Sequence, residues 1–556
     1  MIQSETLSLL EWSRLGQHLS TFAATKLGAI AARQLALPTH QAHSERLLAE
    51  TQEATLLEQK PPGLKFAGIQ DIGDALERAQ RQGLLQGDEL LNIATTLAGA
   101  RQLRRAIDSF EAEELPTLSA LVAPLRTYPD LEKDIHYCID DRGKVADRAS
   151  PKLASLRENL KTQRSEIYQK LHHIMQQNSN AIQEAVITQR GDRFVIPVKA
   201  PQKDAIYGIV HDMSTSGATL YIEPNSIVPM GNRLRQLQRQ EQVEEEAICR
   251  ALTAKVAAVH DDLEDLLRIV TVLDLAAARA RYALWLGANA PRFVPPGEQT
   301  TLRQLRHPLL VWQHQHEAGS AVVPIDVVVN PRTRVVAITG PNTGGKTVTL
   351  KTLGLAALMA KAGLFVPARE PVELPWFDLV LADIGDEQSI EQSLSTFSGH
   401  IKRIGRILAA MGAATDPPAT QGDRPSHPAT QGMPGEQASV EAPGEPDHPG
   451  SPVGEDTQAS PGNRAIALAA NGEPAPADRG DRPAPIRPSS DPDSPVNALI
   501  LLDEVGAGTD PSEGSALAIA LLRHLADRAR FTVATTHYGE LKALKYEDER
   551  FENASV

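Results

Sequence analysis

The sequence is poor in cysteine, in aromatic residues and in long apolar runs. Its 556 residues include two cysteines, Cys138 and Cys249, which show neither a metal-binding spacing nor a disulfide framework. We therefore expect both thiols to be reduced, in a cytoplasmic protein. No apolar run approaches the roughly 20 residues that a membrane-spanning helix needs, and the N-terminal segment lacks the apolar core of a signal peptide. The sequence predicts no membrane partner.

Positive charge is also scarce, because 56 lysines and arginines face 70 acidic residues, a formal net charge of −14. Any contact with a polyanion must therefore use local basic surfaces. Part of the acidity lies in 413–495, which hold 13 acidic and 5 basic residues, 17 prolines, 9 glycines and no aromatic residue. Such a segment cannot bury enough apolar surface to offset its ordering entropy. We expect 413–495 to be a disordered acidic insertion.

What the chain does contain is a phosphate-binding loop. A predicted strand at 335–339 leads into GPNTGGKT, which matches G-x-x-x-x-G-K-[ST], and a helix predicted at 347–361 follows. Backbone N–H groups of such a loop surround phosphates, its lysine faces the β- and γ-phosphates, and its hydroxyl can ligate Mg²⁺. A chance match would occur in roughly a few per cent of chains this long. The predicted ATP-binding residues are Gly340, Pro341, Asn342, Thr343, Gly344, Gly345, Lys346 and Thr347.

Two further apolar strands end in residues that would complete such a site. The run 497–502 leads into Asp503 and Glu504, which predicts a ligand of Mg²⁺ followed by a general base for the attacking water. The run 531–534 leads into Thr-Thr-His, so His537 lies at the carboxyl end of a strand, where parallel sheets bind ligands. A lone histidine is usually structural, but in this context we interpret His537 as a γ-phosphate sensor. The three segments together predict an ATPase.

The residues before the P-loop predict helices around one small β module. Helical apolar spacing through 1–149 predicts a helical core domain. Long helices at 150–177 and 231–285 flank four short strands within about 183–225, a layout of coiled-coil levers that carry a clamp over 150–289. The candidate nucleic-acid contacts of the clamp are Arg190, Arg193, Lys199 and Lys203. The alternative, that Arg193 and Lys199 form the solvent face of a hairpin, has equal weight.

Four motifs together resemble the MutS family of ATPases: GPNTGGKT at 340–347, STFSGH at 395–400, ILLDEVGAGTDP at 500–511 and TTH at 535–537. The segments at 10–28 and 208–224 further resemble its second bacterial branch, MutS-two, and not the mismatch-recognising branch. The implied fold is multidomain, with an α-helical core, coiled-coil levers that carry a small β clamp module, and an α/β P-loop ATPase domain like that of ABC proteins. That last domain would comprise 290–412 and 496–556, on either side of the insertion.

The resemblance also implies a homodimer that hydrolyses ATP with Mg²⁺ and closes a clamp on nucleic acid. Ser395, Thr396 and Ser398, predicted to precede a helix at 401–411, would reach from one subunit to the γ-phosphate of its partner. The substrate would be branched DNA, in the suppression of homologous recombination. One alternative is a ribosome-rescue ATPase that contacts rRNA and splits stalled ribosomes, and another is a catalytically weak binding protein.

The resemblance finally implies that more should follow Val556. Members of the family continue with further ATPase elements, another coiled coil and an Smr nuclease domain. We therefore expect a C-terminally truncated member that lacks the endonuclease activity of that domain. The insertion at 413–495 lies where the family usually has a short connection.

Overall fold

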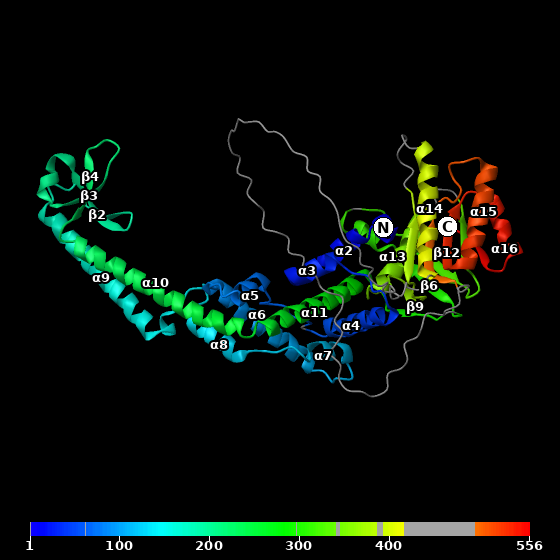
Figure 1. Ribbon diagram of the computed structural model, residues 1–556, viewed down its shortest axis with the longest axis horizontal. Helices are drawn as coiled ribbons and strands as arrows, with labels where there is room; N and C mark the ends of the chain where they lie inside the picture. Colours follow the sequence, from blue (N-terminus) through cyan, green and yellow to red (C-terminus); the bar gives the residue numbers. More distant parts are fainter. Residues whose placement is uncertain are drawn as a thin grey trace, which may run out of the picture. The chain divides into compact units, whose positions relative to one another are not determined.

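In the part of the chain that it describes, the computed structural model contains three β-sheets and numerous helices (Figure 1). The described residues are 2–61, 63–295, 297–317, 319–340, 345–385, 393–415 and 495–556. For residues 2, 393–397 and 413–415 the description covers the backbone and not the side chains. Residues 341–344 of the predicted P-loop and 416–494 of the predicted insertion lie outside this part.

Helices make up the region predicted as the helical core. They are α1 (Ile2–Leu9), α2 (Trp12–Ser20), α3 (Lys26–Arg33), α4 (Gln41–Gln59), α5 (Gly73–Gln80), α6 (Gly87–Asp108), α7 (Pro116–Val122) and α8 (Pro129–Cys138). Leu76, Leu90 and Ile93 are fully buried in one apolar cluster with residues of α11 (His260–Leu286). The helices predicted here are confirmed, but a segment far along the chain completes their core.

The predicted levers and clamp strands are present. α9 (Pro151–Gln177) begins after Ser150, whose hydroxyl accepts hydrogen bonds from the first N–H groups of the helix. α9 lies beside α10 (Val228–Ala257), and both lead to an antiparallel sheet of order β1-β2-β4-β3 (Figure 1). Its strands are β1 (Thr188–Arg190), β2 (Arg193–Lys199), β3 (Gly208–Met213) and β4 (Thr219–Pro224), and the 3₁₀ helix Ala200–Ala205 joins β2 to β3. Leu160, Ile167 and Leu171 of α9 belong to one apolar cluster that also contains residues of α10 and of this sheet.

The long helical tract predicted at 231–285 is confirmed, and it forms two helices, α10 and α11. Val259, with φ −121° and ψ 22°, leaves the helical conformation between them. Neither glycine nor proline marks this break in the sequence. It follows from tertiary packing, since α10 packs on α9 whereas α11 packs on α4 and α3.

The strands predicted at 335–339, 497–502 and 531–534 lie in one parallel sheet of order β10-β11-β12-β8-β13, in which β13 was not predicted. The strands of this sheet are β8 (Val335–Thr339), β10 (Leu379–Asp383), β11 (Val496–Leu502), β12 (Ala529–Thr536) and β13 (Phe551–Ser555). Strands covered on both faces are nearly continuous apolar runs, as Leu499, Ile500 and Leu501 illustrate, each with 0% exposure. Because all the strands are parallel, the residues after β8, β10, β11 and β12 meet at one edge.

A second, mixed sheet of order β5-β9-β6-β7 adjoins this region in the sequence. Its strands are β5 (Pro291–Phe293), β6 (Thr300–Leu305), β7 (Ile325–Val329) and β9 (Arg369–Leu374). The remaining helices are α12 (Pro308–His316), α13 (Lys346–Lys361), α14 (Ser393–Thr415), α15 (Pro511–Arg528), α16 (Leu544–Glu547) and the 3₁₀ helices Asp147–Ala149 and Gly539–Ala543.

α14 corrects two expectations. It begins at Ser393, so Ser395, Thr396 and Ser398 lie within its first turns and do not precede a helix at 401–411. α14 passes through Gly399, because a single glycine costs a helix only about 1 kcal/mol. α14 also continues to Thr415, so the first three residues of the predicted insertion are helical. The remaining domain boundaries stay predictions.

Candidate nucleotide site

The described ends of the P-loop connect β8 to α13. Gly345 is the N-cap of α13 and has φ 87°, a left-handed conformation that glycine adopts without steric cost. Lys346 is 2% exposed, and its Nζ donates to the carbonyl oxygen of Gly340 at 2.9 Å. The lysine ammonium is therefore held beside the loop, at the positive end of the 16-residue helix α13.

Asp503 joins three strands of the sheet at their carboxyl edge. Its Oδ2 accepts a hydrogen bond from the Thr347 hydroxyl at 2.7 Å, and its Oδ1 accepts one from the Thr535 hydroxyl. Its backbone N–H donates to the carbonyl of Asp383 at 2.8 Å. The sequence placed Thr347 and Asp503 in one site, and the structure brings them together.

The Thr347 hydroxyl and the Asp503 carboxylate form an oxygen ligand set of the kind that Mg²⁺ prefers. Mg²⁺ is usually held by one or two protein oxygens together with substrate phosphates and water. Asp503 is 5% exposed, so its carboxylate lies in a nearly dry environment. The residues fit the ion. In the described ranges, no group of three or more His, Cys, Asp or Glu side chains is arranged to hold a metal without such help from substrate and water.

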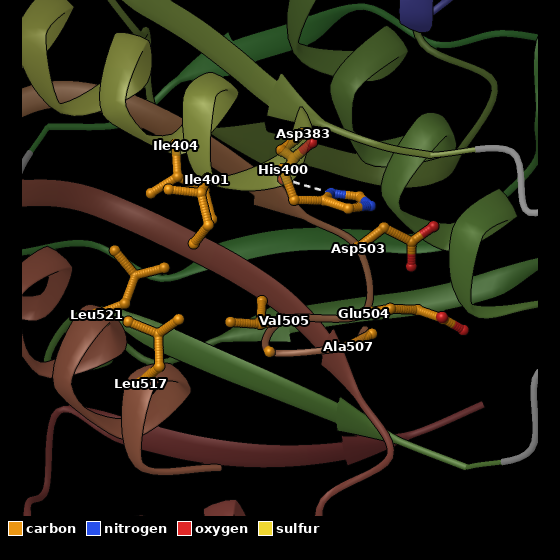
Figure 2. A pocket seen from close by; sticks show the side chains of 11 residues that line it. Asp383, His400, Ile401, Ile404, Asp503, Glu504, Val505, Ala507, Leu517 and Leu521 are labelled. Atoms are coloured by element: carbon orange, nitrogen blue, oxygen red, sulfur yellow. Dashed lines mark hydrogen bonds and ion pairs between the residues drawn. The ribbon is translucent and has the colours of Figure 1, made fainter. Parts of the chain in front are cut away.

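Glu504 adopts a left-handed backbone conformation, with φ 49°. This region is sparsely populated by residues other than glycine and costs of order 1–3 kcal/mol. The backbone N–H of Glu504 donates to the Thr535 hydroxyl at 2.8 Å, which helps to hold the strained turn. In Figure 2 the Glu504 carboxylate extends away from the apolar side chains of α15. Strain of this kind is often concentrated at functional sites.

His537 follows β12, at the same edge of the sheet, as predicted. Its exposed imidazole lies against the ring of Tyr538, with 4.1 Å between ring centroids. The Tyr538 hydroxyl donates to the carbonyl oxygen of Gly506 at 2.8 Å and so connects β12 to the turn after Asp503. The position of His537 fits its predicted role as a γ-phosphate sensor, and that role stays a prediction.

A small pocket opens beside Asp503, between α14, α15 and the ends of β10 and β11 (Figure 2). Its apolar part faces α15, and its polar part carries the carboxylates and one imidazole. The lining residues are Asp383, His400, Ile401, Ile404, Asp503, Glu504, Val505, Gly506, Ala507, Leu517 and Leu521. Ser398, one turn before this lining, is exposed, whereas the side chains of Ser395 and Thr396 lie outside the described set.

A network of ion pairs beside this pocket was not predicted. His400 Nδ1 lies 2.9 Å from Asp383 Oδ2, and Arg403 Nη1 lies 2.6 Å from Asp383 Oδ1. The hydrogen bond to Asp383 raises the pKa of His400, with burial opposing it. The acidic sequence DIGDEQ at 383–388 also predicts a loop near the metal, and 386–388 lie outside the described residues. The position of His400 inside the STFSGH motif was the available signal.

The structure engages most of the predicted clamp contacts within the clamp itself. Arg190 pairs with Asp212 at 2.7 Å and lies over the Tyr221 ring, and Arg193 pairs at 3.2 Å with Glu223, which is 1% exposed. Lys199 Nζ donates to the carbonyl of Asn180 at 3.0 Å, and Lys203 is exposed on the 3₁₀ helix after β2. A partner as deeply buried as Glu223 favours a structural role for Arg193.

Comparison with known proteins matches the chain on both sides of the insertion. A family model described as MutS domain V matches residues 336–415 and 493–556 and leaves out 416–492. Proteins named Endonuclease MutS2 align with all of this chain, at 54% identity for Synechocystis sp. and 37% for both Symbiobacterium thermophilum and Geobacillus sp.. The chain spans 60%, 58% and 60% of the lengths of these three relatives.

None of the described helices is both long enough and apolar enough to cross a bilayer.

Proposed function

Because the chain belongs to the MutS2 family, we propose that it is an ATPase whose nucleotide cycle drives a clamp on nucleic acid. The observation that carries the proposal is the meeting of Thr347, Asp503 and Thr535 in one hydrogen-bonded group. That group lies at the N-terminus of α13, where phosphates are favoured by backbone N–H groups and the helix dipole.

Each residue of the site has a distinct role in the proposed reaction. Mg²⁺, held by Thr347 and Asp503, would neutralise phosphate charge. The Lys346 ammonium, now bonded to Gly340, would turn to the β- and γ-phosphates. Glu504 would orient the attacking water and take its proton, in a conformation that Thr535 restrains. His537, at the adjoining strand end, would contact the γ-phosphate.

A homodimer would complete the site. The first turns of α14, which carry Ser395, Thr396 and Ser398, would act on ATP bound by the partner subunit. Exposure of Ser398 supports this arrangement, because its hydroxyl is available to another molecule. Hydrolysis would then be coupled to the relative movement of two subunits, and through α11 and α10 to the clamp.

For the nucleic acid we propose branched DNA, in the suppression of homologous recombination. The name of the relatives, endonuclease, favours a nucleic-acid substrate. The second candidate is a ribosome-rescue ATPase that binds rRNA. The internal pairing of Arg190 and Arg193 supports this second candidate in one respect. Because both arginines are paired within the clamp, fewer cations are left for the phosphates of a bare DNA duplex. Double-stranded RNA is recognised largely by its shape, which requires fewer such cations.

The experiment that separates these functions uses Glu504→Gln, which should bind ATP without turning it over. The variant is incubated with ATP, branched DNA and ribosomes from one extract and is then sedimented. Retention on DNA, with affinity that falls steeply with salt, would support the recombination role. Sedimentation with ribosomes would support the rescue role. Binding to neither the DNA nor the ribosomes would favour the third alternative, a catalytically weak binding protein.

A further inference from the structure

Asp383 connects the strand end that carries Asp503 to helix α14. Its backbone carbonyl accepts the N–H of Asp503 at 2.8 Å, so its main chain is bonded to the residue before Glu504. Its two carboxylate oxygens accept from His400 and Arg403, at 2.9 and 2.6 Å, and Asp383 is 2% exposed. Asp383 therefore links the first turns of α14 to the segment 503–504 through hydrogen bonds.

Among the side chains that the structure describes on α14, His400 is the one nearest to Ser398 that bonds to another element of the fold. It follows Ser398 by two residues, whereas Arg403, which also bonds Glu5 of α1 at 2.9 Å, lies almost one turn further along. Loss of the His400 bond would leave the first two turns of α14 without their nearest attachment, while Arg403 would keep the rest of the helix in place.

The residue at 385 must be small to leave room for the His400 imidazole. A Cβ atom at Gly385 would lie 3.2 Å from Cε1 and 3.3 Å from Nε2 of His400, closer than side-chain contacts normally allow. Figure 2 shows the ring between Asp383 and Asp503, with its Nδ1 edge toward Asp383. The ring is thus held by a hydrogen bond on one side and by close backbone on the other.

We propose that His400 is a positioning residue that fastens the serine-bearing turns of α14 to Asp383, and through it to the strand end of Asp503 and Glu504. The inference rests on the proposed function, because it assumes ATP hydrolysis at a site completed by the α14 of a second copy. His400 acts through its Nδ1 bond, and its contribution is to kcat and not to the binding of ATP by the subunit that carries it.

Two replacements distinguish this role from direct contact with nucleotide. In His400→Asn the side-chain amide can place a nitrogen where Nδ1 stood and keep the bond to Asp383, whereas His400→Gln can place one near Nε2. We expect His400→Ala and His400→Gln to lower kcat by roughly tenfold, the rate equivalent of one lost charge-assisted hydrogen bond. His400→Asn should keep kcat within about threefold of the wild-type protein, and ATP affinity at equilibrium should change little in all three.

A mixing experiment tests on which subunit His400 acts. The Lys346→Ala subunit has a disabled P-loop but an intact α14. The His400→Ala subunit has an intact P-loop but an α14 whose first turns are no longer fastened. In mixed dimers, the intact α14 of one copy would serve the intact P-loop of the other, so turnover of the mixture should exceed the sum of the two variants. His524→Ala, an exposed histidine of α15, is the control that should match wild type throughout.

Three results would overturn the inference: wild-type kcat in His400→Ala, rescue by Gln in place of Asn, or no gain on mixing, including the case of a protein that forms no dimer. Thermal unfolding of each variant separates these results from misfolding, and a His400→Ala protein that fails to fold leaves His400→Asn against His400→Gln as the decisive pair. If wild type binds no ATP, the proposed function itself fails. If wild type turns over ATP and only the His400 results disagree, the function stands and the inference falls.

Discussion

The guanidinium of Arg279 lies 2.8 Å from the carboxylate of Glu50, and neither side chain is more than 3% exposed. Arg279 comes from α11 and Glu50 from α4, and Arg279 Nη1 also lies 3.3 Å from the carbonyl oxygen of Ala362, just after α13. Burial lowers the pKa of Arg279 despite this pairing. The P-loop helix thus ends against a buried ion pair of the helical core.

Removing one member of this pair should destabilise the protein strongly. Glu50→Ala leaves a buried guanidinium without its carboxylate, and we expect the free energy of unfolding in urea to fall by about 3–5 kcal/mol. The exposed pair Lys26–Asp71 is the control, where Asp71→Ala should change the same quantity by less than about 1 kcal/mol. Equal effects at the two sites would contradict the structural importance of the buried pair.

Lys361, at the last turn of α13, should make stability depend on alkaline pH. Its Nζ donates at 2.8 Å to the carbonyls of Phe377 and Asp378, and burial lowers its pKa to about 8, from 10.5 in the unfolded chain. Between these values the unfolded state binds more protons, so the free energy of unfolding should rise with pH. We expect the wild-type value minus that of Lys361→Met to increase from pH 8 to 10.5. A flat or falling difference would contradict the shift.

Substitutions of Lys346 and Glu504 should separate the binding of ATP from its hydrolysis. Lys346→Ala removes the phosphate-facing cation and should abolish ATP binding at equilibrium. Glu504→Gln keeps the shape of the side chain without its basicity, so ATP should bind while turnover falls by about 100-fold or more. Turnover at the wild-type rate in Glu504→Gln would assign the base to another group.

Thr535 should matter for both stability and turnover. Its fully buried hydroxyl donates to Asp503 and accepts from the N–H of Glu504, so Thr535→Val removes a group used by two site residues. We expect a loss of about 1–3 kcal/mol in the free energy of unfolding, together with reduced ATP turnover. Thr535→Ser keeps the hydroxyl and should restore most of both. Failure of Ser to do better than Val would show that the methyl packing is what counts.

Replacing residues 416–492 by a short Gly-Ser linker should leave the ATPase domain intact. The family model matches on both sides of this segment, and each halving of loop length gains only about 0.6 kcal/mol of closure entropy. The free energy of unfolding should therefore rise by less than about 2 kcal/mol. A large decrease would mean that the segment packs on the remainder of the protein.

Much of the nucleotide site could be predicted because its parts are local. Strand, glycine-rich loop and helix follow one another without interruption, so the motif and its apolar flanks determined β8 and α13. Apolar runs ending in Asp503 and Thr535 likewise determined β11 and β12. Parallel pairing then brings their carboxyl ends to one edge, because strands that run in the same direction all end at the same side of the sheet.

What the tertiary structure decided are the contacts between segments far apart in sequence. Nothing local marks the break at Val259, the passage of α14 through Gly399, or the pairing of Arg279 with Glu50 and of His400 with Asp383. These depend on which helix faces which, and a charged or polar side chain has several possible partners until packing excludes all but one. By itself, the sequence determined the chemistry at the strand ends, and only the folded chain decided how helices α11, α13 and α14 are attached to it.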